Sequence, residues 1–421
     1  MASGLCLVVA LLAGCAARTS QPAPSPAMIP ALEARVQQDP SNSEARTRLA
    51  SAYVQADRAQ DAVGVLEPIT DPGPAPSEAS FFLGLAYEEL GRLADARREY
   101  ARVLEAGASD DLLRRLRGRL LLLERRELVQ AVRAALQQEQ TLATREPPPR
   151  TLGVFPFLTG LGESLRPLSL AFAELLSSDL AETDRLTVVE RGRIQFLLNE
   201  LALADSGVVD PRTAARAGRL LGAGRLVQGR IDGSENALRI QALVIAASAA
   251  PDLDTSPLTQ QGALADLFAL QSDLAIAIFE RIGITLTAAE RERVARRPTQ
   301  NVQALLAFGL GIQDEDAARY RAATSDYERA VRLDPAFEAA VEALERARLL
   351  AEASEESTDD LALDFTFGRS LWVVRRERFS GVEEMIPDPG IRDPIWEILG
   401  VEGLLRRALV DLRIGRPGGT E

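Results

Sequence analysis

Hydrophobic residues recur at helical spacing along the first 146 residues and then give way to shorter apolar runs. Between residues 110 and 143, leucines and valines recur every three or four positions without a proline, which predicts one long helix. Pro147-Pro148-Pro149 marks a domain boundary. From there to about residue 295, short apolar strands alternate with helical segments. This order predicts helices that cover a small sheet.

A second periodicity, of 34 residues, lies within the N-terminal helices. A small residue in the first helix of each unit would let the second helix approach, and a tyrosine would fill the gap beside it. The period and pattern resemble the tetratricopeptide repeat, and a generic pair of helical hairpins is the alternative. The positions expected to pack the two repeats are Leu49, Ala50, Tyr53, Ala62, Leu83, Gly84, Tyr87, Ala96 and Tyr100.

The same repeat pattern returns at residues 301–350, after a short hinge. Leu310-Gly311 fits the first helix of the unit, although the tyrosine expected at position 314 is an aspartate. The packing positions that follow are Ala323, Tyr327, Ala330 and Pro335. Residues 351–359 are polar and predict a linker, and the C-terminal region that follows contains both tryptophans. We expect these tryptophans to lie in a core or, alternatively, to form an exposed partner site.

Within the central segment, Thr151–Phe157 and Leu186–Val189 predict strands. Residues 225–231 and 238–246 predict a hairpin with a five-residue turn at 232–236. Helices are expected between these strands and at residues 263–282, which would close the domain.

The N-terminus begins with a short apolar run that ends in Leu12-Ala13-Gly14-Cys15. The run is too short to span a bilayer and is typical of the apolar part of an export signal. Its end resembles the bacterial lipoprotein signal, which implies lipidation of Cys15 and anchoring in the outer membrane. The first six residues carry no basic side chain, so the start codon is uncertain, and an ordinary cleaved signal is the alternative.

Composition excludes many kinds of catalysis. All 48 basic residues are arginine and the chain has no histidine, which rules out Ser-His-Asp triads, Schiff bases and P-loop lysines. The net charge of −13 argues against nucleic acid as a partner. The acidic clusters lack calcium-loop spacing. We therefore expect no enzymatic activity, no cofactor and no metal.

The central segment also resembles a known family. The stretch at residues 186–231 is similar to the CsgG family of curli secretion lipoproteins, and the resemblance extends over roughly residues 150–295. The residues that carry this resemblance are Val189, Glu190, Arg191, Gly207, Asp210, Leu221, Gly222, Ala223 and Gly229. We expect Glu190 and Arg191 to form a structural ion pair at the end of a strand.

Pore-forming members of that family insert two hairpins into the membrane. Each strand needs about 9–11 residues of alternating polarity. Here the first hairpin turns within five residues, and the second candidate region, residues 248–262, contains two prolines and no alternation. The resemblance therefore implies the periplasmic domain without the pore.

These observations predict a multidomain α plus α/β fold in which tetratricopeptide repeats flank a CsgG-like α/β sandwich domain. The expected function is an outer-membrane-anchored periplasmic scaffold that binds envelope or secreted proteins through its repeats, and a homo-oligomer is possible. A ring-forming curli-type secretion component is the alternative. The predicted divisions are a signal peptide (1–15), a linker (16–29), repeats and long helix (30–146), the α/β domain (150–295), a helical repeat (301–350) and a C-terminal region of unknown fold (360–421).

Overall fold

The computed structural model describes residues 25–70, 77–107, 109–142, 144–201, 211–247, 256–363 and 365. All of them belong to one compact unit, Met1–Phe367. The predictions for Cys15, for the export signal and for both tryptophans lie outside the described residues.

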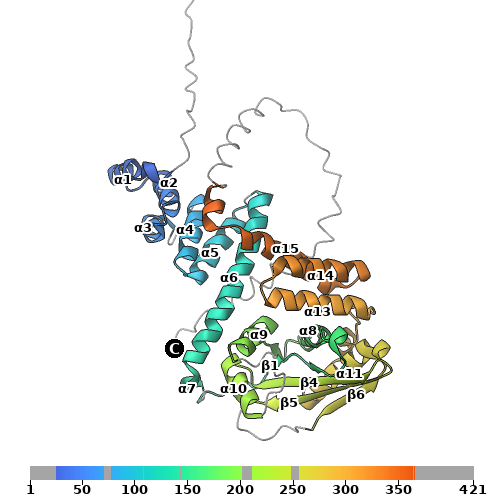
Figure 1. Cartoon of the computed structure of the whole chain (residues 1–421). Helices are drawn as coiled ribbons and strands as arrows, with labels where there is room; N and C mark the ends of the chain where they lie inside the picture. Colours follow the sequence, from blue (N-terminus) through green and yellow to red (C-terminus); the bar gives the residue numbers. More distant parts are fainter. Residues whose placement is uncertain are drawn as a thin grey trace, which may run out of the picture. The chain divides into compact units, whose positions relative to one another are not determined.

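The N-terminal part consists of antiparallel helices that pack in chain order (Figure 1). Asn42 caps the second helix by accepting a hydrogen bond from the backbone N–H of Ala45 at 2.9 Å. The long helix expected at 110–143 begins at Asp110 and ends at Gln137, where a short helix follows. The helices are α1 (Ile29–Gln38), α2 (Ser43–Val54), α3 (Ala59–Thr70), α4 (Ser77–Glu89), α5 (Leu93–Glu105), α6 (Asp110–Gln137) and α7 (Glu139–Leu142).

The central domain has a mixed six-stranded sheet in the order β3-β1-β4-β5-β6, and β2 also pairs with β4. The β1, β2 and β3 pairings are parallel, whereas β4 with β5 and β5 with β6 are antiparallel. The strands are β1 (Thr151–Val154), β2 (Leu158–Thr159), β3 (Thr187–Val188), β4 (Arg225–Ser234), β5 (Ala237–Ala246) and β6 (Leu258–Gly262).

Two strand predictions differ from the structure. The segment Thr151–Phe157 is not one strand, because Pro156 has no N–H to donate and the chain leaves the ladder there before it resumes as β2. The hairpin turn is shorter than five residues, because β4 and β5 pair as far as Ser234 and Ala237. The hairpin is thus part of the domain sheet along its whole length.

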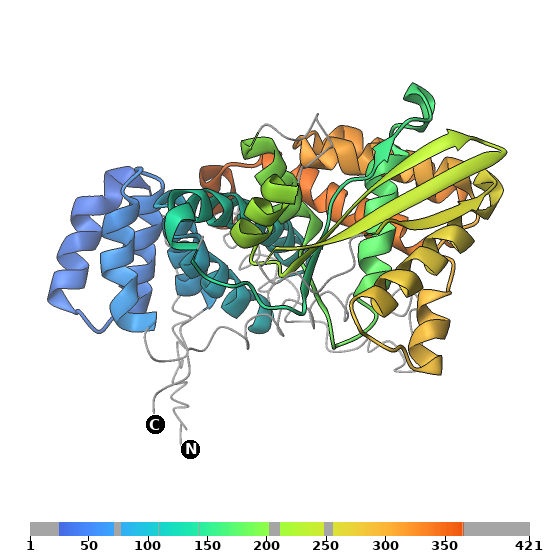
Figure 2. The same ribbon diagram turned by 90° about the horizontal axis from the view of Figure 1, so that it is seen from below.

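Helices cover both faces of this sheet. The first face packs against α8 and α11 and forms the largest core. Along β5, buried residues alternate with more exposed ones, as expected of a strand with one face in a core. The opposite face, near the start of β4, packs against α9 and α10. Figure 2 shows β4 and β5 crossing in front of α8. The helices are α8 (Leu168–Leu180), α9 (Arg191–Glu200), α10 (Pro211–Leu221), α11 (Leu267–Arg281) and α12 (Ala288–Val294).

A second group of repeat helices follows the central domain. It consists of α13 (Val302–Asp316), α14 (Tyr320–Leu333) and α15 (Glu338–Glu355). The linker predicted at 351–359 is largely helical, because α15 continues to Glu355 and residues 358–363 are also helical. Alanines at helical spacing bury one side of α15 as far as Ala353, so its polar residues lie on the outer side of a continuing helix.

The two groups of repeat helices contact each other through α6 and α15. A Cβ added to Gly118 in α6 would lie 2.5 Å from the carbonyl oxygen of Leu349 in α15, so the two backbones approach closely. Arg125 of α6 donates hydrogen bonds to the carbonyls of Glu315 and Asp316 at 2.7 and 2.9 Å, at the C-terminus of α13. The central domain is therefore inserted in the sequence between helices that pack together in space.

Candidate functional site

The predicted repeat positions lie at helix contacts. A Cβ on Gly84 would lie 2.5 Å from the ring of Tyr100, and one on Gly311 would lie 2.5 Å from the ring of Tyr327. Pro335 is exposed in the turn before α15. The other predicted packing residues are almost completely buried: Leu49, Ala50, Tyr53, Ala62, Leu83, Tyr87, Ala96, Tyr100, Ala323, Tyr327 and Ala330.

Two buried charge clusters accompany these tyrosines, and neither was predicted. In the first, the Glu88 carboxylate accepts hydrogen bonds from the hydroxyl of Tyr100 at 3.1 Å and from Nε of Arg119 at 3.0 Å. The second repeats this arrangement around Glu315, with the hydroxyl of Tyr327 at 3.0 Å and Nε of Arg346 at 3.1 Å.

The sequence spacing is the same in both clusters. Each glutamate lies 12 residues before its tyrosine and 31 residues before its arginine. The helices α4, α5 and α6 thus correspond one to one with α13, α14 and α15. This spacing, Glu-x11-Tyr-x18-Arg, is the sequence signal that would have shown that α6 and α15 are equivalent helices.

The first group of repeats already holds a helical segment of this chain. Leu361 and Ala362 are fully buried in the core of the N-terminal helices. The ring of Phe365 stacks on Phe81 of α4, with centroids 4.1 Å apart. Arg119 of α6 donates to the backbone carbonyl of Glu356 at 2.6 Å, next to the end of α15. Part of the repeat surface expected to bind a partner is therefore covered by residues 356–363 and Phe365.

The predicted CsgG-like residues fall in two places. Val189, Glu190, Leu221 and Gly222 line one cavity, and Ala223 is buried beside it. Gly229 lies on β4, where a Cβ would meet the ring of Phe157 at 2.2 Å. Gly207 and Asp210 are outside the described residues.

The prediction of an ion pair between Glu190 and Arg191 is wrong. Arg191 forms its ion pairs with Glu174 of α8 at 2.9 Å and with Asp316 of α13 at 2.6 Å. Arg191 thus links the central domain to the second group of repeats. Glu190 instead lies between two neighbouring cavities, both of which it lines.

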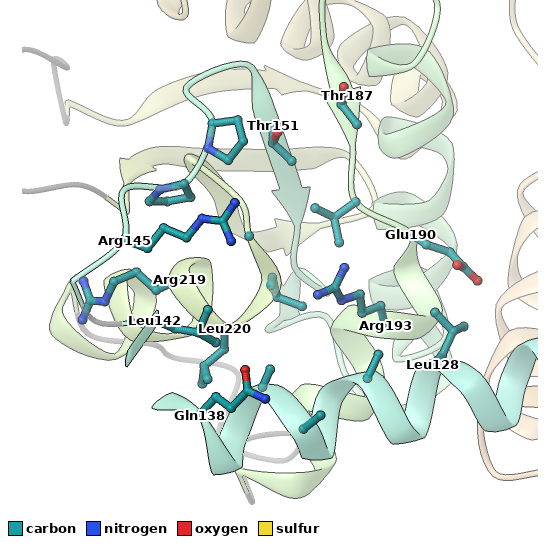
Figure 3. A pocket seen from close by; sticks show the side chains of 18 of the residues that line it. Leu128, Gln138, Leu142, Arg145, Thr151, Thr187, Glu190, Arg193, Arg219 and Leu220 are labelled. Atoms are coloured by element: carbon teal, nitrogen blue, oxygen red, sulfur yellow. The ribbon is translucent and has the colours of Figure 1, made fainter. Parts of the chain in front are cut away.

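The cavity of about 650 Å³ that Val189 lines is here called the junction pocket, because α6 forms one wall and the central domain forms the other. Its apolar wall comes from α6, α7 and α10. Three arginines line it, Arg145, Arg193 and Arg219. Figure 3 shows the guanidinium groups of Arg145 and Arg193 pointing toward the same space from opposite sides, whereas that of Arg219 points away.

Burial perturbs the charges around the junction pocket. It raises the pKa of Glu190 to about 7, and the nearby charge of Glu124 adds to this effect. Burial lowers the pKa of Arg193, although Glu190 opposes the shift. The Nε atom of Arg193 is buried and has no hydrogen-bond partner. This one N–H donor has lost water without gaining a hydrogen-bond partner among the described residues, which costs free energy.

Neither a metal site nor a membrane-spanning helix is found among the described residues. No group of three or more metal-ligating side chains occurs in that part of the chain. The helices described there are all too short or too polar to cross a membrane.

Comparison with known proteins shows a family similarity within the central domain. Residues 162–241 match the family described as "Curli production assembly/transport component CsgG". No curated protein matches the chain. Among solved structures, it is similar to a tetratricopeptide repeat protein from Parabacteroides merdae, with 14% identity over 76% of this chain and 91% of that chain, at a TM-score of 0.21. The match to the CsgG family thus lies within the central domain, between the two groups of repeat helices.

Proposed function

We propose that this chain is a non-enzymatic, lipid-anchored scaffold on the periplasmic face of the outer membrane. In this proposal, its repeats bind a segment of an envelope or secreted protein, and its CsgG-family domain places it in curli-type assembly or transport without forming a pore. The family description supports the envelope setting. The apolar run that ends at Cys15 supports the anchor.

The observation that carries the proposal is the packing of residues 356–363 and Phe365 on the first group of repeats. It shows how these repeats bind a helix: apolar side chains are buried on α4, and an arginine of α6 binds backbone carbonyls. Repeat proteins use the same chemistry for partner segments. In the second group of repeats, Leu333 and Val341 are large apolar residues that are 42% and 39% exposed. We place the partner surface on this second group of repeats.

The partner surface is tested by photo-crosslinking in living cells. A photoreactive amino acid at Val341 should give a discrete adduct with an envelope or secreted protein. The matched control places the same amino acid at Arg239, which is exposed on β5 of the central domain. An absence of adducts at Val341, or the same adducts at both positions, would contradict the proposal.

The lipid anchor has a separate test. The full-length chain should incorporate a labelled fatty acid and sediment with membranes, and Cys15→Ser should abolish both properties. Cys6→Ser is the matched control, because Cys6 lies in the segment that would be removed with the signal. Fatty-acid incorporation that persists in the Cys15→Ser variant would exclude the anchor.

A further inference from the structure

We infer that the junction pocket binds an amphipathic carboxylate, that is, one carboxylate group attached to an apolar body. The inference concerns the face of the CsgG-family domain that contacts α6, and it does not depend on the proposed binding of partners by the repeats.

The size and lining of the pocket suit such a ligand. A volume of about 650 Å³ is within the range of small-molecule sites, which is about 300–1,000 Å³. Apolar side chains from three helices form most of the wall, and a few polar groups converge on it, as in most ligand sites. The apolar residues are Leu128, Ala131, Ala134, Ala135, Leu142, Leu220 and Leu221.

The charged side chains that line the pocket favour an anionic ligand. Arg145 and Arg193 point into the same space from opposite sides (Figure 3). Arg219 is engaged elsewhere, because it donates to the carbonyl of Ala247 at 3.4 Å. The carboxylate that lines the pocket, Glu190, has its pKa raised to about 7, so much of it is neutral near that pH. The charged side chains that line the pocket are therefore mainly cationic.

Arg193 provides the specific contact. Its guanidinium points into the pocket (Figure 3) and offers its terminal N–H donors there. A carboxylate accepts two parallel hydrogen bonds from a guanidinium, and the interaction is stronger away from water. A phosphate would satisfy the same donors, but it would leave the apolar wall uncovered. The combination favours a carboxylate with an apolar body, such as a fatty acid or the C-terminus of an apolar peptide.

Calorimetry with defined probes tests this inference on the full mature chain. Octanoate should bind, and octanamide, which has the same apolar body without the charge, should bind about 10- to 100-fold more weakly. Arg193→Gln should remove this preference. Arg239→Gln is the control for the loss of a positive charge, since Arg239 lies on β5 and does not line the pocket, and it should keep the preference.

A second variant covers the case in which Arg193→Gln does not fold. Ala134→Trp keeps every charge and fills the pocket from an exposed position on α6, so it should abolish octanoate binding while the circular dichroism spectrum stays unchanged. The tripeptide acetyl-Ala-Leu-Leu, as free acid and as amide, distinguishes a peptide C-terminus from a fatty acid. If the free acid binds more tightly than octanoate, the pocket is assigned to a peptide C-terminus. If octanoate binds more tightly, it is assigned to a fatty acid. The inference is overturned if neither carboxylate binds more tightly than its own amide, or if Ala134→Trp binds octanoate normally.

Discussion

The substitution Glu88→Gln removes the negative charge from a cluster that is almost completely buried. The side chains of Glu88 and Arg119 are 3% and 6% exposed. The carboxylate of Glu88 also accepts hydrogen bonds from Tyr100 and, at 3.1 Å, from Arg126. Glutamine has nearly the same volume, so the substitution leaves the packing intact and leaves the charge of Arg119 uncompensated. Such a loss typically costs about 3–5 kcal/mol of unfolding free energy.

The chain has several parts, so one overall unfolding curve would not report this loss cleanly. Hydrogen exchange measured by mass spectrometry reports the protection of backbone amides in α4, α5 and α6 separately. A cost of about 3–5 kcal/mol corresponds to roughly 150- to 5,000-fold faster exchange of the best protected amides in these helices. Exchange in β4 and β5 of the central domain should change much less, because that sheet belongs to a different core.

Glu67→Gln is the matched control. Glu67 accepts a hydrogen bond from the hydroxyl of Tyr87 at 2.8 Å and pairs with Arg92, but its side chain is 46% exposed. A pair at such a site contributes about 0–1 kcal/mol, so exchange should rise less than about fivefold. If Glu88→Gln and Glu67→Gln gave the same exchange rates in α4, α5 and α6, the argument from burial would be refuted.

Three further predictions concern packing and pH. Gly84→Ala should destabilise the N-terminal repeats by about 1–3 kcal/mol, because its Cβ would lie 2.5 Å from the ring of Tyr100. Gly64→Ala, which faces open space in α3, should stabilise them by about 0.5–1 kcal/mol. Changes of the same sign in hydrogen exchange of α3, α4 and α5 would contradict this. Burial raises the pKa of Asp179 to about 8, so the folded state holds a proton that the unfolded state releases. Unfolding free energy should therefore fall between about pH 4 and pH 8; Asp179→Asn should flatten this dependence, and a Tm–pH profile parallel to that of the wild type would count against it. Leu361→Ala should cost about 2–5 kcal/mol and speed hydrogen exchange at residues 357–363; unchanged exchange there would show that the segment does not depend on this contact.

Local patterns in the sequence were sufficient to predict the type of most elements. The 34-residue period identifies repeat positions that are buried, and the small residue Gly84 faces the ring of Tyr100. The apolar alternation identifies β5, because one side of that strand faces a continuous core. The predicted ends of elements were wrong where polar residues continue a helix, as at the end of α15, and where a proline interrupts a strand, as at Pro156.

Contacts between distant segments could not be predicted in this way. The pairing of Arg191 with Asp316 joins residues 125 positions apart, and no local periodicity contains that information. The contact of α6 with α15 and the junction pocket depend in the same way on how the central domain is inserted. Glu88 and Arg119 resemble ordinary surface charges in the sequence, because burial of a charge is decided by helices that pack over it later in the chain.

The mass of the mature, lipid-anchored protein extracted in mild detergent tests the proposed scaffold most directly. Light scattering should give the mass of one or two chains, as expected of a tethered scaffold that does not form a pore. The same extraction of the Cys15→Ser variant gives the mass without the lipid and its bound detergent. A closed ring of many subunits would contradict the account and favour a secretion channel of the curli type.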